Sequence, residues 1–209
     1  MTSTGQRPTP TPGRRTPKTP HDRRTDILQA GLTVYRTIGF TEAKVSDITA
    51  AAGIAKGTFY LYFETKDHVL GALWERHVDT IITTAEDILA QAHAWWPTID
   101  RLLAALVRHT VNNVELHRIV YSTANAKALE MCRACDERVI HLITAFVIRG
   151  THAGAFHATN PQWACRMLYH ATRSLLHHLI TTGDPINTEQ ITRSVLETAH
   201  RTLNAPEHP

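Results

Sequence analysis

A short run of basic, hydroxylated and small residues after Gly53 has the chemistry of a surface that contacts phosphate. It reads Ile-Ala-Lys-Gly-Thr-Phe-Tyr-Leu-Tyr-Phe over residues 54–63. An ammonium and hydroxyls donate hydrogen bonds to phosphate oxygens, and a glycine lets the backbone come close to its partner. The residues that could do this are Lys56, Gly57, Thr58, Tyr60 and Tyr62. The run is therefore a candidate for contact with the phosphates and base edges of a nucleic acid.

Two short helices joined by a tight turn are needed to present that run. Gly53 supplies the positive φ that such a joint requires, and the alanines at 50–52 let the preceding helix approach its neighbour. Ile48, Ile54 and Phe59 are expected to pack the two helices together. A short second helix enters the major groove of DNA by its N-terminal end. The pattern predicts a helix-turn-helix.

The segment over about residues 23–72 resembles the DNA-binding signature of the TetR (tetracycline repressor) family. The resemblance rests on Ala52-Gly53-Ile54, Lys56-Gly57-Thr58-Phe59-Tyr60, Tyr62-Phe63 and Lys66-Asp67. It implies core packing by Phe59 and Phe63. It implies DNA contact by Val45, Lys56, Gly57, Thr58, Tyr60, Tyr62 and Lys66.

Two positions depart from the family pattern. Thr49 stands where a small alanine is usual inside the second helix. Ala55 replaces a frequent serine or threonine ahead of the lysine, so one hydroxyl that could reach a phosphate is lost.

The resemblance implies a bacterial transcriptional regulator that binds double-stranded operator DNA as a homodimer. We expect a repressor that a small, largely apolar ligand releases, because the ligand favours one spacing of the two DNA-binding heads over another. Neither a cofactor nor enzymatic activity is expected, since the sequence has no paired carboxylates, phosphate loop, nucleophile elbow or metal motif. The ligand, the operator, the regulated genes and the choice between repression and activation cannot be read from these residues.

Hydrophobic periodicity predicts an all-α fold. Apolar residues recur at spacings of three and four, and β-type alternation is not sustained. Gly39 is the expected end of the first helix, and Thr65 is the expected N-cap of a long one. A less regular stretch is expected over residues 115–125. The expected helices cover about residues 21–38, 46–52, 65–92, 97–114, 129–150, 161–181 and 188–203.

Composition and periodicity divide the chain into four parts. Residues 1–20 contain five prolines and predict an extended, disordered arm. Residues 21–66 are the expected three-helix DNA-binding domain, residues 67–204 a larger helical ligand-binding and dimerisation domain, and residues 205–209 a tail.

Charge is unevenly distributed along the chain. Residues 1–25 carry six basic side chains against Asp22, a net charge of +5, whereas the whole chain carries +3. A basic end beside a weakly acidic body is typical of a protein whose one end meets a polyanion, and a solvated tail explains the arm equally well. A nonspecific architectural DNA-binding protein is therefore an alternative.

The larger domain contains candidates for two surfaces. Residues that could line an apolar ligand cavity, with two polar anchors among them, are Trp74, Val78, Leu103, Leu106, Val107, Tyr121, Ile143, Met167 and His170. For each of them, plain core packing is the favoured interpretation. Residues that could form a dimer interface of four helices are Met167, Leu168, Ala171, Leu175, Leu179, Ile191, Val195, Leu196 and Ala199.

The cysteines and histidines raise the alternative of a metal- or redox-sensing repressor. Cys132 and Cys135 are three apart, so they share a helix face, and His141 is near in sequence. A structural zinc site normally has four ligands, and the 14 histidines are scattered over several helices, so no metal site is predicted.

The expected location is the cytoplasm. No run of about 18 apolar residues appears, which argues against a membrane partner. The first 20 residues lack the apolar stretch of a signal peptide, and three cysteines suggest no disulfide framework.

Overall fold

The computed structural model describes residues 19–122 and 126–204, and every regular element in those ranges is an α-helix. The predicted all-α fold is confirmed. The helices are α1 (Pro20–Ile38), α2 (Val45–Ala52), α3 (Lys56–Tyr60), α4 (Lys66–Ala90), α5 (Trp95–Asn112), α6 (Val114–Ser122), α7 (Ala126–His152), α8 (Pro161–Thr182) and α9 (Thr188–Leu203).

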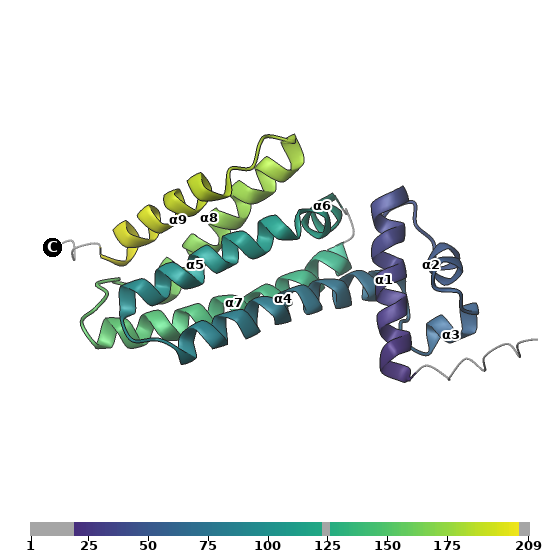
Figure 1. Ribbon diagram of the computed structural model, residues 1–209, viewed down its shortest axis with the longest axis horizontal. Coiled ribbons are helices and arrows are strands. Elements are labelled where there is room, and N and C mark those ends of the chain that lie inside the picture. Colours follow the sequence, from purple (N-terminus) through teal and green to yellow (C-terminus); the bar gives the residue numbers. More distant parts are fainter. Residues whose placement is uncertain (1–18, 123–125, 205–209) are drawn as a thin grey trace, which may run out of the picture.

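The helices form a small head and an elongated body. Figure 1 shows α1, α2 and α3 at one end of the molecule, with α4 leading from them into the bundle of α5 to α9. Helix α4 packs against α7, α5 and α1, so it belongs to both parts. Within the described residues, no helix combines the length and the apolar character that crossing a membrane requires.

The first helix begins one residue earlier than predicted. Thr19 is its N-cap, and the Thr19 hydroxyl accepts a hydrogen bond from the Asp22 N–H at 3.1 Å. The Asp22 carboxylate in turn accepts from the Thr19 N–H at 3.2 Å, which completes a capping box. Pro20 suits the first helical position because that residue needs no intrahelical donor. The remainder of the predicted arm, residues 1–18, lies outside the described residues.

The helix-turn-helix has the predicted turn chemistry. Gly53 ends α2 in the left-handed conformation, with φ 62° and ψ 40°. The unusual Thr49 is buried, and its hydroxyl donates to the Ser46 carbonyl at 3.0 Å. The hydroxyl therefore has a partner inside α2, and the larger residue is accommodated without an unpaired polar atom.

The prediction of an irregular stretch over residues 115–125 was wrong. Helix α6 occupies Val114–Ser122 and buries Leu116, Ile119 and Val120. The inward face also holds His117, a polar residue that interrupts the apolar pattern in the sequence. A tertiary contact of His117, described below, satisfies this residue. Residues 123–125 of the stretch lie outside the described part of the chain.

Two other helices start at or near the predicted residues. Helix α4 begins as predicted after Thr65, whose hydroxyl accepts from the His68 N–H at 3.4 Å. Helix α5 starts at Trp95 instead of Pro97. Proline is tolerated there because the N–H groups of the first turn have no intrahelical acceptor.

Replacement of Gly53 tests the turn. No atom lies within 4 Å of a Cβ built on Gly53, so the cost of Gly53→Ala is a backbone cost. We expect the free energy of unfolding to fall by about 1–2 kcal/mol, measured by urea titration, and Gly53→Asn to lose less. Gly57→Ala is the control, since Gly57 lies in α3 and also has open space around it. Equal stability of Gly53→Ala and the unmodified protein would contradict the assignment.

Candidate functional site

Helix α3 divides its residues between the core of the head and the surface. Phe59 and Phe63 are buried, which confirms their predicted packing role, and their ring centroids lie 6.1 Å apart. Lys56 and Gly57 are exposed, Tyr60 is 50 % exposed and Leu61 is 82 % exposed. The two phenylalanines therefore hold the helix with its N-terminal residues and Tyr60 facing outward.

The remaining predicted contact residues have smaller free surfaces. Thr58 and Tyr62 are half-buried. Val45 is the first residue of α2, and its half-buried side chain packs against the core of the head. Each of these three residues can therefore offer only part of its side chain to a partner.

The prediction of DNA contact by Lys66 is corrected by the structure. The Lys66 ammonium donates to the carbonyls of Phe40 at 2.7 Å, Thr41 at 2.8 Å and Ala43 at 2.8 Å. An ammonium has three donors, so all of them are used within the chain. The ammonium also lies 4.8 Å from the centroid of the Phe40 ring. Lys66 holds the loop between α1 and α2 against the start of α4.

Tyr35 makes a second connection between head and body. Its hydroxyl donates to the Lys66 carbonyl at 2.8 Å, which ties the end of α1 to the first residue of α4. Burial raises the pKa of the Tyr35 phenol well above its usual range, so the hydroxyl stays a donor. The head is therefore held on α4 by the side-chain ammonium of Lys66 and by its main-chain carbonyl.

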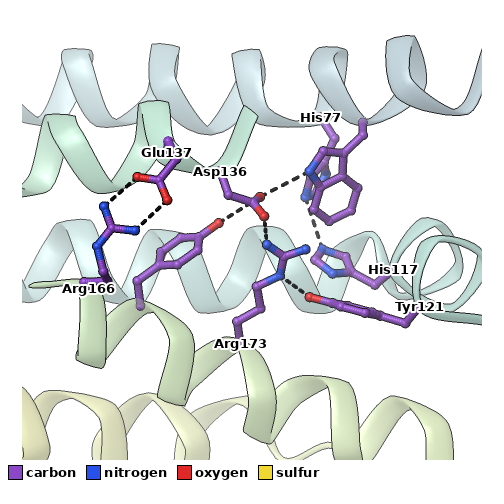
Figure 2. A network of polar contacts seen from close by, with 9 residues as sticks. His77, His117, Tyr121, Asp136, Glu137, Arg166 and Arg173 are labelled. Atoms are coloured by element: carbon purple, nitrogen blue, oxygen red, sulfur yellow. Dashed lines mark hydrogen bonds and ion pairs between the residues drawn. The ribbon is translucent and has the colours of Figure 1, made fainter. Parts of the chain in front are cut away.

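A buried polar centre joins α4, α6, α7 and α8 (Figure 2). The Asp136 carboxylate of α7 accepts from the Trp74 indole N–H at 3.2 Å and the Tyr169 hydroxyl at 3.1 Å. It also forms an ion pair with Arg173 of α8, and the Arg173 guanidinium donates to the Tyr121 hydroxyl of α6. Four helices thus share one set of hydrogen bonds.

A chain of three histidines adjoins that centre. His77 Nδ1 lies 3.1 Å from His109 Nε2, and His77 Nε2 lies 3.1 Å from His117 Nε2. Burial, followed by the neighbouring histidines and Arg173, lowers the pKa of His77 to about 3 and that of His117 to about 2. Burial also lowers the pKa of His109. These three histidines are therefore uncharged at neutral pH.

Sequence reasoning missed most of this centre. Asp136 follows the buried Cys132 by four residues, and Arg173 follows the buried Tyr169 by four. A charged residue on the apolar stripe of each of two helices was the available signal, because such residues are almost never buried unless paired. Of the centre's residues, only Trp74 and Tyr121 were among the predicted ligand contacts.

The other predicted ligand residues separate into groups. Leu106 and Ile143 line a cavity of about 200 Å³ between α4, α5 and α7. Trp74 and Val78 line a small void beside Leu106, and Leu103 lines another. Val107 is buried in the core.

The prediction of ligand contact was wrong for Met167 and His170. Both are exposed on α8, with Met167 63 % exposed, and neither lines the cavity or the two voids described above. The apolar stripe of α8 turns its Leu168 and Tyr169 inward instead.

The predicted dimer residues also separate. Leu168, Ile191, Val195 and Ala199 are buried within the chain's own core, so they are withdrawn as dimer contacts. Leu179 and Leu196 are half-buried and pack against that core. The predicted positions that remain exposed are Met167, Ala171 and Leu175, all on α8.

The cysteine pair does not have the environment of a reactive or metal-binding site. Cys132 is buried, and burial raises the pKa of its thiol to about 12. Burial also raises the pKa of the half-buried Cys135, and Glu75 adds to the shift. Within the described residues, no group of three histidine, cysteine or acidic residues could hold a metal ion.

A helix-turn-helix head joined to an all-helical body defines a class of bacterial regulatory proteins. A family model described as bacterial regulatory proteins of the tetR family matches residues 27–73, and a tetracyclin repressor-like C-terminal domain model matches residues 96–193. Together these matches span more than half of the chain, which belongs to the TetR family.

Several known proteins are similar to the chain. The regulator YvdT of Bacillus subtilis is 31 % identical over 109 residues, 51 % of this chain and 55 % of YvdT. EthR of Mycolicibacterium smegmatis is 35 % identical over 86 residues, 41 % of this chain and 38 % of EthR. The match covers about half the length of YvdT, about half of the Staphylococcus aureus regulator SAR0097 and 38 % of EthR.

Solved structures share the fold at low identity. The fatty acid degradation regulator FadR of Bacillus halodurans has a TM-score of 0.75 at 20 % identity, covering 93 % of this chain and 100 % of that one. FadR of Bacillus subtilis, solved with stearoyl-CoA, has a TM-score of 0.74 at 17 % identity, covering 86 % of this chain and 99 % of that one.

The neutral histidines predict a pH dependence of stability. Unfolded histidines bind a proton below about pH 6.5, whereas the pKa values of folded His77 and His117 are lowered, so protons favour the unfolded state. Stability should fall as the pH drops from about 6.5 toward 5, with a slope approaching about 1.4 kcal/mol per pH unit for each histidine.

His117→Gln keeps a hydrogen-bonding group and removes one titrating site. Urea unfolding at several pH values should give a slope near pH 5 that is smaller by about 1.4 kcal/mol per pH unit. His93→Gln, at an exposed position between α4 and α5, is the control and should leave the slope unchanged. Identical slopes for His117→Gln and the unmodified protein would contradict the inference that folded His117 is uncharged.

Proposed function

We propose that this chain is a ligand-responsive repressor that binds operator DNA as a two-fold dimer, with α3 in the major groove. The observation that carries the proposal is the presentation of α3. Phe59 and Phe63 are buried beneath it, while Lys56, Gly57 and Tyr60 face outward from a head anchored to α4. A short helix held in this way is the reading element of a helix-turn-helix.

The roles of the individual residues follow from their chemistry. Lys56, Thr58, Tyr60 and Tyr62 donate to phosphate oxygens or base edges. Gly57 has no atom within 4 Å of its absent Cβ, so packing within the chain does not require a glycine there. Close approach of the DNA backbone to α3 would explain why position 57 is a glycine. Leu61 offers an apolar contact of the kind that thymine methyl groups accept.

The exposed face of α8 supports dimerisation. Trp163 is 62 % exposed, Met167 63 % and Leu175 42 %, and each lies on the same helix face as the exposed Ala171 because the spacing is four residues. Large apolar side chains in a continuous row mark an interaction surface. The α8 helices of two copies can cover each other, which places two α3 helices on one pseudo-palindromic site.

Release from DNA requires a ligand that prefers one of two states of the body. Helix α4 is the connection that such a ligand can act through, since it carries the head and contributes Trp74 and His77 to the buried centre. The solved complex of FadR from Bacillus subtilis with stearoyl-CoA supports regulation of this fold by a small molecule.

Selection of bound sequences from a random DNA pool tests the function. We expect a pseudo-palindromic site with half-site centres about 34–36 Å apart, or a multiple of one helical turn. Recovery of no preferred sequence at moderate salt would instead favour a nonspecific architectural DNA-binding protein.

Removing the Lys56 charge should weaken binding to every sequence. With DNA from that selection, Lys56→Gln should reduce the slope of log affinity against log salt by about 0.9 for each protomer, because one phosphate contact is lost. Arg193→Gln removes an exposed charge on α9 and is the control. An unchanged salt slope in Lys56→Gln, measured by fluorescence anisotropy, would remove Lys56 from the interface.

A charge on the exposed face of α8 should separate the two protomers. Leu175→Glu is expected to sediment as a folded monomer and to bind the selected DNA at least tenfold more weakly, because each head then binds alone. Ile38→Glu changes an apolar side chain of similar exposure, 45 %, on α1 and should leave the dimer intact. A monomeric unmodified protein at micromolar concentration, or a dimeric Leu175→Glu variant, would overturn this interface.

A further inference from the structure

The cavity between α4, α5 and α7 combines an apolar interior with a polar opening. Its volume is about 200 Å³. The apolar residues that line it are Ile81, Ala85, Leu102, Ala105, Leu106, Val139 and Ile143. The polar residues that line it are Thr84, Arg108 and Asn112, which are exposed, and His109, which is half-buried.

Arg108 is the charged residue of this lining, and it makes no ion pair or hydrogen bond with any residue in the described part of the chain. The arginines at the buried centre and on the surface of α7 differ in this respect. Arg173 is paired with Asp136, and Arg138 with Asp79 at 2.8 Å. The mouth of the cavity therefore carries a positive charge that an anionic group could neutralise.

We propose that this cavity binds a small amphipathic carboxylate, with the apolar part inside and the carboxylate at the mouth beside Arg108 and Asn112. The inference rests on the proposed ligand-responsive function and names the class of its ligand. An apolar cavity of about 150 Å³ holds a benzene molecule, so the volume here suits one aromatic ring or a short branched alkyl group.

The interior of the body determines the orientation of the ligand. Two further voids adjoin the cavity, and Leu106 lines all three spaces. The first void also shares Ile81 with the cavity, and the second shares Ile143. These voids measure only about 20 and 10 Å³. The void that shares Ile81 is also lined by Asp136 and Arg173, whose charges already balance. A carboxylate placed there would therefore add a buried charge with no partner. The charged end stays outside, and a long chain does not fit.

The ligand would act directly on the helix that carries the head. Ile81 and Ala85 belong to α4 and form one wall of the cavity. His109 on the rim is also hydrogen-bonded to His77 of α4 at 3.1 Å. A ring held between α4 and the facing helices changes the preferred position of α4, and the head moves with it.

Isothermal titration of the full chain with matched probes tests this site. The carboxylates are phenylacetate, benzoate, 3-phenylpropionate and isovalerate, and the neutral analogue of the first is 2-phenylethanol. We expect at least one carboxylate to bind with a Kd below about 1 mM. Phenylacetate should bind more tightly than 2-phenylethanol, and laurate should bind more weakly than the best carboxylate because twelve carbons exceed the cavity.

Two variants identify the groups responsible. Arg108→Gln should weaken the best carboxylate at least tenfold and change the affinity for the alcohol less than twofold. Arg101→Gln, two helical turns earlier on α5 and exposed, is the matched control. Ala105→Phe fills the cavity and should abolish binding of both probes, with circular dichroism checking that the variant is folded.

The proposal is overturned if none of the four carboxylates binds, if laurate binds more tightly than all of them, or if Arg108→Gln leaves carboxylate affinity unchanged. The binding of the selected DNA is measured on the same samples. Intact sequence-specific DNA binding with no carboxylate binding rejects this ligand class alone, whereas loss of sequence preference rejects the proposed function.

Discussion

The ion pair between Asp136 and Arg173 is the interaction on which the arrangement of the body depends. Asp136 is buried and the Arg173 side chain is 16 % exposed, while Trp74, Tyr169 and Tyr121 supply the additional hydrogen bonds around the pair. Removing one partner of such a buried pair costs about 3–5 kcal/mol, because the other charge is left uncompensated. The positions of α4, α6, α7 and α8 are therefore coupled, since a shift of any one of them disturbs the same set of contacts.

This coupling explains how a change in the body can reach the head. Helix α4 contributes Trp74 to the buried centre, and eight residues earlier its Lys66 holds the carbonyls of the loop after α1. Tyr35 adds a bond from α1 to the same residue of α4. A rigid helix with strong contacts at Lys66 and again at Trp74 transmits a displacement between these two points instead of absorbing it. The small volume of the inner voids also favours transmission, because densely packed side chains cannot take up a shift locally.

Local chemistry made the head predictable from the sequence. Gly39 and Gly53 end helices because each adopts a positive φ, and Thr65 begins α4 because its hydroxyl satisfies an otherwise free N–H. These effects act within a few residues. The role of Lys66 was not predictable in this way, because its three acceptors lie 23 to 26 residues away along the chain. A lysine next to a phosphate-contacting surface suggests a phosphate contact until the fold shows another partner.

The difference between local effects and contacts distant in the sequence also accounts for the wrong predictions in the body. The stretch at residues 115–125 looked irregular because His117 stands on the buried face, and only its contact with His77 makes a histidine acceptable there. Residues far apart in sequence create that environment, so no local pattern reports it.

Apolar stripes on the last two helices left a comparable ambiguity, since periodicity indicates that a face is covered and not what covers it. Helix α9 uses Ile191, Val195 and Ala199 within its own chain. Helix α8 has a buried stripe with Leu168 and Leu176, and a second, exposed one with Trp163, Met167 and Leu175. A helix with apolar residues on two faces has more apolar surface than its own chain covers. That excess, rather than the mere presence of a stripe, distinguishes the exposed face of α8, which we propose as the dimer interface, from ordinary core.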